Sequence, residues 1–243
     1  MRHESNRWGI VLNASEEDEK KWRINLRSPF DPFVEEVEDE TGTYFVVKSS
    51  SFHEMTDPSE VYKAAQKLFR GLNAEMLQHN QTNYIWPGSV VEFLGNQKPR
   101  KIHIGVGHSV ASPQVSRAEG VGIDVDGNVK WQTPGPSQAQ LWAQAAYLNS
   151  DIESAMAYIA GNPDWTDLFK AYEALEKFPK GNISKKQIQL FTHTANTIGR
   201  HHNKGRKTPP EKPMSVSEGR RLILRLITAA IDDTLESGPE RHR

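Results

Sequence analysis

The pattern of apolar and polar residues changes near the middle of the chain. In the first part, short apolar runs are bounded by turn residues, as at residues 8–13, 33–38 and 43–48, and such runs predict β-strands. The sequence Asp-Glu-Thr-Gly at residues 39–42 predicts a hairpin turn between the second and third of these strands. Beyond about residue 137, apolar residues instead recur every three or four positions, which predicts amphipathic helices.

Two helices are predicted among the strands of the first part. Ser15 followed by acidic residues at 16–18 is a favourable helix N-terminus, and we expect a short helix from there to about residue 26. Residues 57–60 (Asp-Pro-Ser-Glu) combine a capping residue, a proline at the first helical position and an acid of the capping-box type. Apolar residues then keep helical spacing from Val61 to Met76, so a second helix of about four turns is expected.

Further strands are predicted after the second helix, at residues 90–94, 101–106, 121–125 and 128–132. The last two flank Asp126-Gly127, a strong hairpin signal. Up to the first of these four strands, the order is strand, helix, strand, strand, helix, strand, the order of a split-βαβ or ferredoxin-like sheet. The sequence therefore predicts an α+β fold class, with such a sheet at the N-terminus and an extra hairpin added to it.

A breaker cluster at residues 133–137, Thr-Pro-Gly-Pro-Ser, predicts the boundary between two domains. Helical spacing then runs through five segments that end near the C-terminus. The last of them begins with Ser215 and Glu218, a capping-box pair, and its apolar residues include Leu226. We therefore expect an α+β domain at residues 1–133 and an all-α helical bundle at residues 138–238.

The helix predicted from residue 184 to residue 202 carries the most chemically suggestive side chains. Its apolar residues form one stripe, namely Ile188, Phe191, Ala195 and Ile198. On the helical wheel His193, Asn196 and Arg200 share a face roughly opposite that stripe, where side chains three and four residues apart can touch. Histidine exchanges protons near neutral pH, and the arginine guanidinium matches phosphate, so this face is a candidate site for anion binding or acid–base chemistry. It can equally be a solvated helix end, because the helix dipole favours cations there.

Charge is unevenly distributed along the chain. Residues 1–60 hold 14 acidic against 7 basic residues, whereas residues 184–225 hold 10 basic against 2 acidic ones. Such a basic segment can bind nucleic acid, and it can also dock on an acidic surface of the same or another chain. The residues expected to contact nucleic acid are Lys185, Lys186, Lys204, Arg206 and Lys207.

Composition and motifs exclude several classes of protein. The chain has no cysteine, which excludes disulfides, thiolate catalysis and cysteine-ligated metals. The first residues lack the apolar core of a signal peptide, and no apolar run is long enough to span a membrane, so the cytoplasm is the expected compartment and no membrane partner is expected. No zinc-protease, nucleotide-binding or nucleophile-elbow motif is present. We therefore expect no cofactor and no bound metal.

The C-terminal part resembles two groups of proteins. The residues that carry the first resemblance are Asp167–Glu173, Thr194-Ala195-Asn196, Arg200-His201 and Pro213-Met214-Ser215 before a last amphipathic helix. This pattern, over about 80 residues, is similar to that of uncharacterised bacterial proteins. A basic helical bundle with Asn, Arg and His near a helix end also resembles HEPN-type domains, many of which are dimeric, metal-independent ribonucleases of toxin and phage-defence systems. Their hallmark is an Arg followed after four to six residues by His; here His201 and His202 follow Arg200 directly.

Two functional hypotheses follow from the sequence. In the first, the bundle handles RNA or another phosphate-bearing ligand. Arg200 would hold the phosphate, His193 or His201 would act as general base or acid, and Asn196 would orient the reacting groups. In the second, the protein is a non-catalytic adaptor whose same helix face binds a partner protein or a second copy in a homodimer. An enzyme acting on a small molecule is a third class that the sequence leaves open.

Overall fold

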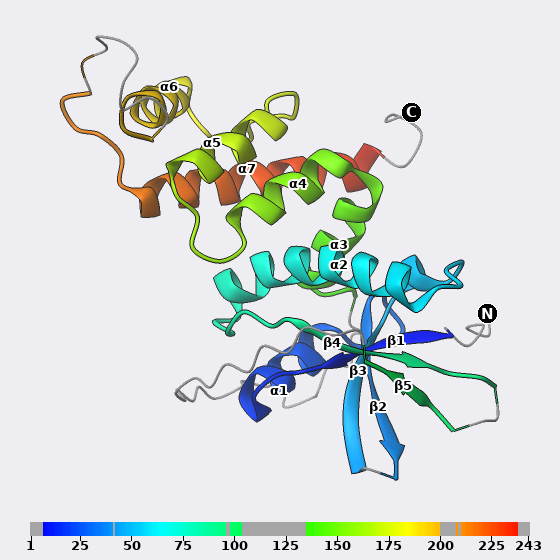
Figure 1. The fold of residues 1–243 in the computed structure, drawn as a ribbon. Helices are drawn as coiled ribbons and strands as arrows, with labels where there is room; N and C mark the ends of the chain where they lie inside the picture. Colours follow the sequence, from blue (N-terminus) through cyan, green and yellow to red (C-terminus); the bar gives the residue numbers. More distant parts are fainter. Residues whose placement is uncertain are drawn as a thin grey trace, which may run out of the picture.

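The computed structural model describes residues 7–40, 42–95, 98–103, 135–199, 208 and 210–237. It has the α+β class that the sequence predicts, with an antiparallel sheet in the N-terminal part and a helical region in the C-terminal part (Figure 1). None of the helices in these residues is both long and apolar enough to cross a membrane.

The sheet has the strand order β2-β3-β1-β4-β5, and every neighbouring pair is antiparallel. Its strands are β1 (Trp8–Leu12), β2 (Phe33–Asp39), β3 (Gly42–Lys48), β4 (Pro87–Glu92) and β5 (Arg100–Ile102). The first four strands, with α1 (Glu16–Asn25) after β1 and α2 (Pro58–His79) after β3, have the split-βαβ arrangement, so this prediction is confirmed. The strand predicted at residues 101–106 is described only to residue 103, and the hairpin predicted at 121–132 lies outside the described residues.

Both early helices pack on the same face of the sheet. Trp8, Ile10 and Leu12 alternate along β1 and share one buried cluster with Trp22 of α1 and Phe69 of α2. The rings of Trp22 and Phe69 are 5.2 Å apart between centroids. Because alternate residues of a strand point to the same face, this cluster fixes which side of β1 faces the helices.

Local capping explains where these helices begin. The Ser15 hydroxyl accepts a hydrogen bond from the backbone N–H of Asp18 at 3.2 Å, and the Asp57 carboxylate accepts one from the N–H of Ser59 at 2.9 Å. Each cap satisfies a backbone donor that the first helical turn leaves without a partner. Pro58, which lacks that donor, occupies the start of α2 as predicted.

The C-terminal part contains α3 (Gln138–Leu148), α4 (Ser150–Ile159), α5 (Trp165–Ala174), α6 (Lys185–Thr194), a π-helical segment η2 (Ala195–Gly199) and α7 (Val216–Ser237). Capping boxes begin α3, α5 and α6 at Ser137, Asp164 and Ser184. The apolar stripe of α7 is buried against α3, α4 and α5, as the spacing predicts; Leu226 in its centre is 1% exposed. Burial of this stripe holds the helical region together.

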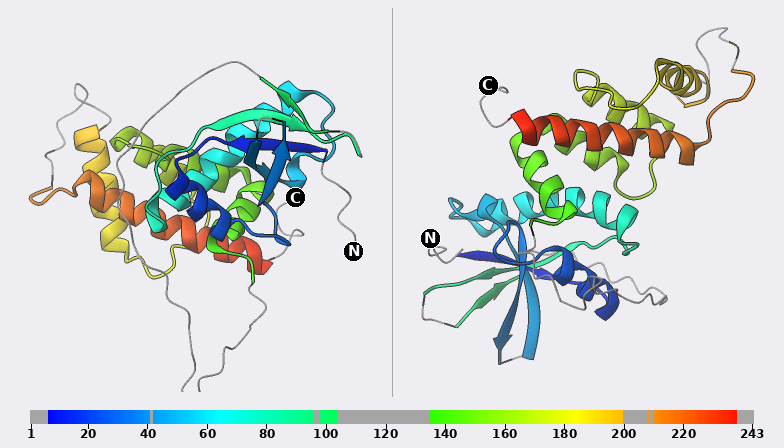
Figure 2. Two further views of the ribbon diagram at one scale, coloured as in Figure 1. Left: turned by 90° about the horizontal axis from the view of Figure 1, so that it is seen from below. Right: turned by 180° about the vertical axis from the view of Figure 1, so that it is seen from behind.

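Helices α2 and α3 join the two parts of the molecule. Ala139 and Ala143 of α3 belong to the buried cluster on the sheet, whereas Trp142 and Ala145 of the same helix belong to the cluster of the helical region. Figures 1 and 2 show α2 between the sheet and the remaining helices, with α3 alongside it. The division into domains at residues 133–138 stays a prediction. Because α3 contacts both clusters, its position determines where a cavity can form between the two parts.

Candidate functional site

The helix face that the sequence singles out lies on α6 and η2. His193 is exposed, and its Nε2 lies 3.0 Å from the carbonyl oxygen of Thr208. Asn196 is partly buried. Arg200 and His201, the other two predicted site residues, lie outside the residues that the structure describes. The described part of this face therefore holds one imidazole, which already contacts a backbone carbonyl, and one amide.

The π-helical segment η2 changes the register of this helix. Phe191 and Ala195 are buried as the predicted stripe requires, but Ile198 is 38% exposed, so its assignment to the core side is wrong. In a π-helical turn the hydrogen bonds span five residues, and each residue turns the chain by less than the 100° of an α-helix. The side chains that follow Ala195 are therefore rotated away from the positions that uniform α-helical spacing predicts.

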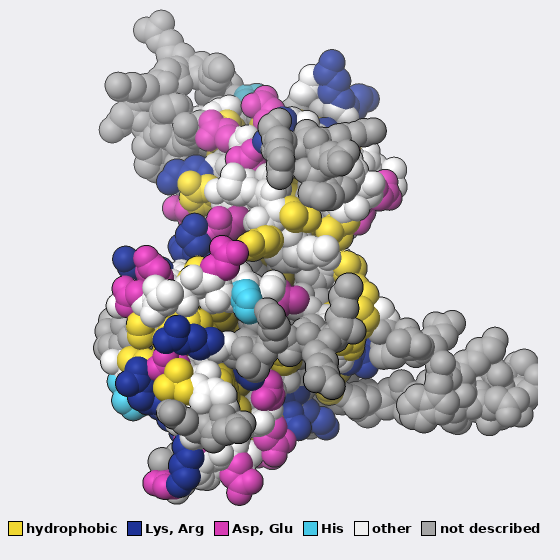
Figure 3. All heavy atoms as spheres, turned by 90° about the vertical axis from the view of Figure 1, so that its right-hand side faces the viewer, with side chains coloured by type: hydrophobic (Ala, Val, Ile, Leu, Met, Phe, Trp, Pro, Cys, Tyr) yellow, Lys and Arg dark blue, Asp and Glu magenta, His cyan; other side chains and the backbone are white. Residues whose placement is uncertain are grey.

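Two of the predicted nucleic-acid-binding residues are described. Lys185 and Lys186 are exposed in the first turn of α6, while Lys204, Arg206 and Lys207 lie outside the described residues. On the face drawn in Figure 3, lysine, arginine and acidic side chains are interspersed, and the described cations do not gather into one patch.

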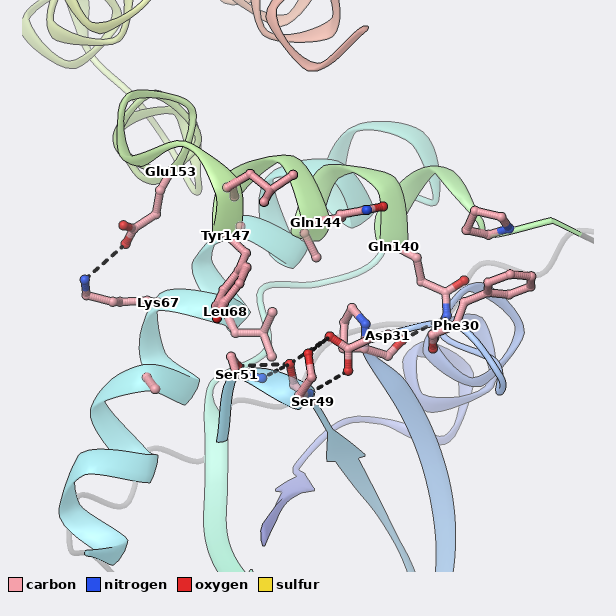
Figure 4. A pocket seen from close by; sticks show the side chains of 18 of the residues that line it. Phe30, Asp31, Ser49, Ser51, Lys67, Leu68, Gln140, Gln144, Tyr147 and Glu153 are labelled. Atoms are coloured by element: carbon pink, nitrogen blue, oxygen red, sulfur yellow. Dashed lines mark hydrogen bonds and ion pairs between the residues drawn. The ribbon is translucent and has the colours of Figure 1, made fainter. Parts of the chain in front are cut away.

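A cavity of about 740 Å³ lies between the sheet part and the helical part of the molecule. Its walls come from the loop at residues 29–32, from the segment 49–51, from α2 and from α3, so residues far apart in sequence meet there. One side is apolar, with Met55, Leu68 and Ala143 among its residues. Figure 4 shows Leu68 and Tyr147 on one side of the space and Gln140 and Phe30 on the other.

The floor of the cavity is a hydrogen-bonded group of one carboxylate and three serines. The short helix η1 (Ser50–Phe52) begins there, and the backbone N–H of Ser50 donates to Oδ1 of Asp31 at 2.7 Å. Oδ2 of Asp31 accepts from the Ser50 hydroxyl at 2.9 Å and from the Ser49 hydroxyl at 3.2 Å. The Ser49 hydroxyl also lies 2.9 Å from that of Ser51. Asp31 thus organises the polar floor and accepts a backbone N–H at the start of η1, whose N-cap is Ser49.

Gln140 fixes the loop that forms one end of the cavity. Its buried side-chain amide donates to three backbone carbonyls, those of Arg27, Phe30 and Pro32, at 2.9, 3.0 and 2.9 Å. Its Oε1 accepts from the N–H of Ser137 at 3.0 Å, which completes the capping box of α3. One side chain of α3 therefore satisfies the polar groups of a loop more than a hundred residues earlier in the sequence.

The mouth of the cavity carries an ion pair and an aromatic ring. Lys67 of α2 and Glu153 of α4 approach to 3.7 Å between Nζ and Oε1 (Figure 4). Tyr147 of α3 is 74% exposed although its ring is large and apolar. Large apolar side chains that stay exposed beside a cavity are typical of binding sites.

A buried carboxyl group on α2 forms a second cluster away from this cavity. Glu75 is 1% exposed, and Nδ2 of Asn80 lies 3.1 and 3.4 Å from its two oxygens. Burial raises the pKa of Glu75 to about 7, and the hydrogen bond from Asn80 opposes that rise. Nδ1 of His79 is 3.4 Å from Oε1, and the His79 ring meets the Trp142 ring edge-on. Glu75 does not line the cavity, so we assign it to the contact between α2 and α3.

The cavity has no direct signal in the sequence. Its one local mark is the run of serines at 49–51 directly after β3. Leu68 fits the apolar spacing of α2, but it is only partly buried, because it packs against the cluster on the sheet and also lines the cavity. Asp31 and Gln140 are polar residues whose roles depend on contacts over long sequence distances.

Comparison of the chain with protein-family models, with curated proteins and with solved structures finds no match. Within the described part of the chain, no group of three or more His, Asp or Glu side chains is arranged to hold a metal ion. The basis for a functional proposal is therefore the geometry of the cavity.

Proposed function

We propose that this protein binds a small organic molecule in the cavity between its sheet and its helical region. The observation that carries the proposal is a space of about 740 Å³ with apolar walls and a polar floor. Ligand sites typically measure roughly 300–1,000 Å³ and combine apolar walls with a few polar groups that orient the ligand. Gln140 and Asp31 hold both ends of the floor in place through hydrogen bonds, so the site is formed before a ligand enters.

The proposed function is binding, without a chemical step. Among the described residues, those that line the cavity include no histidine, and the chain has no cysteine. The serine hydroxyls of the cavity floor form hydrogen bonds with Asp31 and with one another. An activated serine needs a general base that is itself oriented by a third group. A binding protein without catalysis is also compatible with the adaptor hypothesis. In that case the bound ligand would form part of the surface that contacts the partner protein.

Leu68→Trp is expected to abolish binding of a neutral probe, because the larger ring fills the apolar side of the cavity. Tryptophol is a suitable probe, since it joins an apolar indole to one hydroxyl group. Saturation-transfer NMR with tryptophol should give a signal for the wild-type protein and at most about a tenth of it for the variant. Because overpacking can destabilise a protein by about 1–3 kcal/mol, the melting temperature of the variant is measured first.

Leu94→Trp is the matched control, because Leu94 is 38% exposed and does not line the cavity. It should leave the tryptophol signal unchanged. The proposal is overturned if wild-type protein gives no signal at millimolar tryptophol, or if a folded Leu68→Trp protein binds the probe as well as the wild type does.

RNA handling by the face of α6 remains a separate prediction. Lys185 and Lys186 are exposed at the N-terminal end of α6, where the helix dipole favours acids, so helix stability does not explain their placement. If they contact phosphates, changing both to glutamine should reduce the slope of log affinity against log salt by about 1–2 for single-stranded RNA. Filter binding at several salt concentrations measures this slope, and an unchanged slope would exclude them from an RNA interface.

A further inference from the structure

We infer that the ligand of the cavity carries an amino group, which lies against Asp31, on an otherwise apolar body. This inference rests on the proposed function and specifies the chemical class of the ligand. It depends on the charges that line the cavity, on the hydrogen-bonding capacity of its floor and on the character of its walls.

The charges around the cavity favour a cation. Among the described residues, three charged side chains line it: Asp31, Lys67 and Glu153. Lys67 lies 3.7 Å from Glu153 at the mouth, so these two charges largely offset each other. Within the described residues Asp31 makes hydrogen bonds only with serines and has no cationic partner. The floor therefore retains one negative charge.

The hydrogen-bonding capacity of the floor also favours a donor on the ligand. An ionised carboxylate offers about four acceptor positions. Three donors use three of these positions on Asp31, so about one remains for a ligand. The hydroxyl oxygens of Ser49, Ser50 and Ser51 also retain lone pairs, because an oxygen that donates one hydrogen can still accept. An ammonium group, with three donors and no acceptor, matches this surface, whereas a phosphate or carboxylate would present acceptors to acceptors.

The walls favour an apolar body attached to this group. Met55, Leu68 and Ala143 face the same space as Asp31, and Tyr147 lies at its side (Figure 4). Burial of apolar surface contributes to affinity without setting orientation, whereas the charge contact sets it. Phe30 and Tyr147 add aromatic rings, whose faces attract cations. The same walls would leave a highly charged ligand, such as a nucleotide, without partners for its phosphates.

The test uses a matched series of probes on the full-length protein: tryptamine, tryptophol and indolepropionate. They share the indole body and end in an ammonium, a hydroxyl and a carboxylate. Isothermal titration calorimetry at pH 7 should show that tryptamine binds about tenfold more tightly than indolepropionate, with tryptophol between them. Asp31→Asn keeps the shape of the side chain and should remove most of this preference while tryptophol affinity changes less than about threefold.

Asp151→Asn is the control, because Asp151 lies on α4 outside the cavity and pairs with Lys177. It should leave the preference for tryptamine intact. If tryptophol binds but wild-type protein prefers indolepropionate, or does not distinguish the two charged probes, the amine inference is overturned while the binding site stands. If none of the three probes binds, both proposals fail. The wild-type comparison decides the inference even if Asp31→Asn does not fold, since it needs no variant.

Discussion

Glu75→Gln should make the protein more stable at pH 8, by about 3 kcal/mol in the free energy of unfolding. The reason is that burial raises the pKa of Glu75 to about 7, from about 4.5 in the unfolded chain. Each unit of pKa shift corresponds to about 1.4 kcal/mol. Glutamine keeps the shape of the side chain and the hydrogen bond from Asn80, and it never ionises.

The sign follows from proton binding. Below about pH 4.5, Glu75 is protonated in both states and its ionisation has no effect on stability. Between about pH 4.5 and 7 the folded state binds the proton more tightly, so stability is lost as the pH rises and the loss is complete above about pH 7. The gain from Glu75→Gln should therefore be large at pH 8 and small at pH 5.

Urea denaturation at these two pH values measures the effect. Glu54→Gln is the control, because Glu54 is exposed and its replacement should change stability by less than about 0.5 kcal/mol at either pH. A Glu75→Gln protein that is less stable than wild type at pH 8 would show that the folded protein holds Glu75 as a carboxylate.

Gln140→Ala should lower the free energy of unfolding by about 2–4 kcal/mol. The amide of Gln140 donates to the carbonyls of Arg27, Phe30 and Pro32, and alanine leaves these oxygens without that donor. A buried polar group that loses its partner costs roughly 1–3 kcal/mol, and the deleted side chain also leaves a void. Tryptophol affinity should fall as well, because the loop at residues 29–32 forms part of the cavity wall.

Gln144→Ala provides the comparison on the same helix. Gln144 lies one turn after Gln140 and lines the cavity, but it is exposed and makes no side-chain hydrogen bond with the described residues. Its replacement should change stability by less than about 0.5 kcal/mol. Thermal and urea denaturation of both variants distinguish the two residues, and a loss below about 1 kcal/mol for Gln140→Ala would contradict the role of its amide as a tie between α3 and the loop.

The fold could be predicted to the extent that its signals are local. Capping residues such as Ser15, Asp57 and Ser215 begin helices where the sequence indicates, because a cap acts on the backbone two or three residues away. The helix–strand order was enough to predict the split-βαβ sheet, since few topologies accept it. The π-helical turn at Ala195 was missed because uniform spacing cannot reveal a local change of helix type.

The cavity could not be predicted, because no single segment contains it. Asp31, Ser50, Leu68 and Gln140 each have an ordinary local role, as a loop residue, a helix start, an apolar position and a capping-box amide. Only the packing of α3 against α2 brings them around one space. The helix face at His193, by contrast, is easy to identify because its residues are close together in the sequence. Closeness in the sequence alone does not show that a binding site is formed.

The position of α3 in two buried clusters has a consequence for how the molecule comes apart. Trp142 and Ala145 cannot leave the helical cluster without pulling Ala139 and Ala143 from the cluster on the sheet, since a helix moves as a rigid rod over eleven residues. Unfolding of either half thus exposes apolar surface of the other, so we expect the two halves to melt together. A molecule bound beside α3 would then slow the exchange of amide hydrogens with solvent in both halves, including amides that it does not contact.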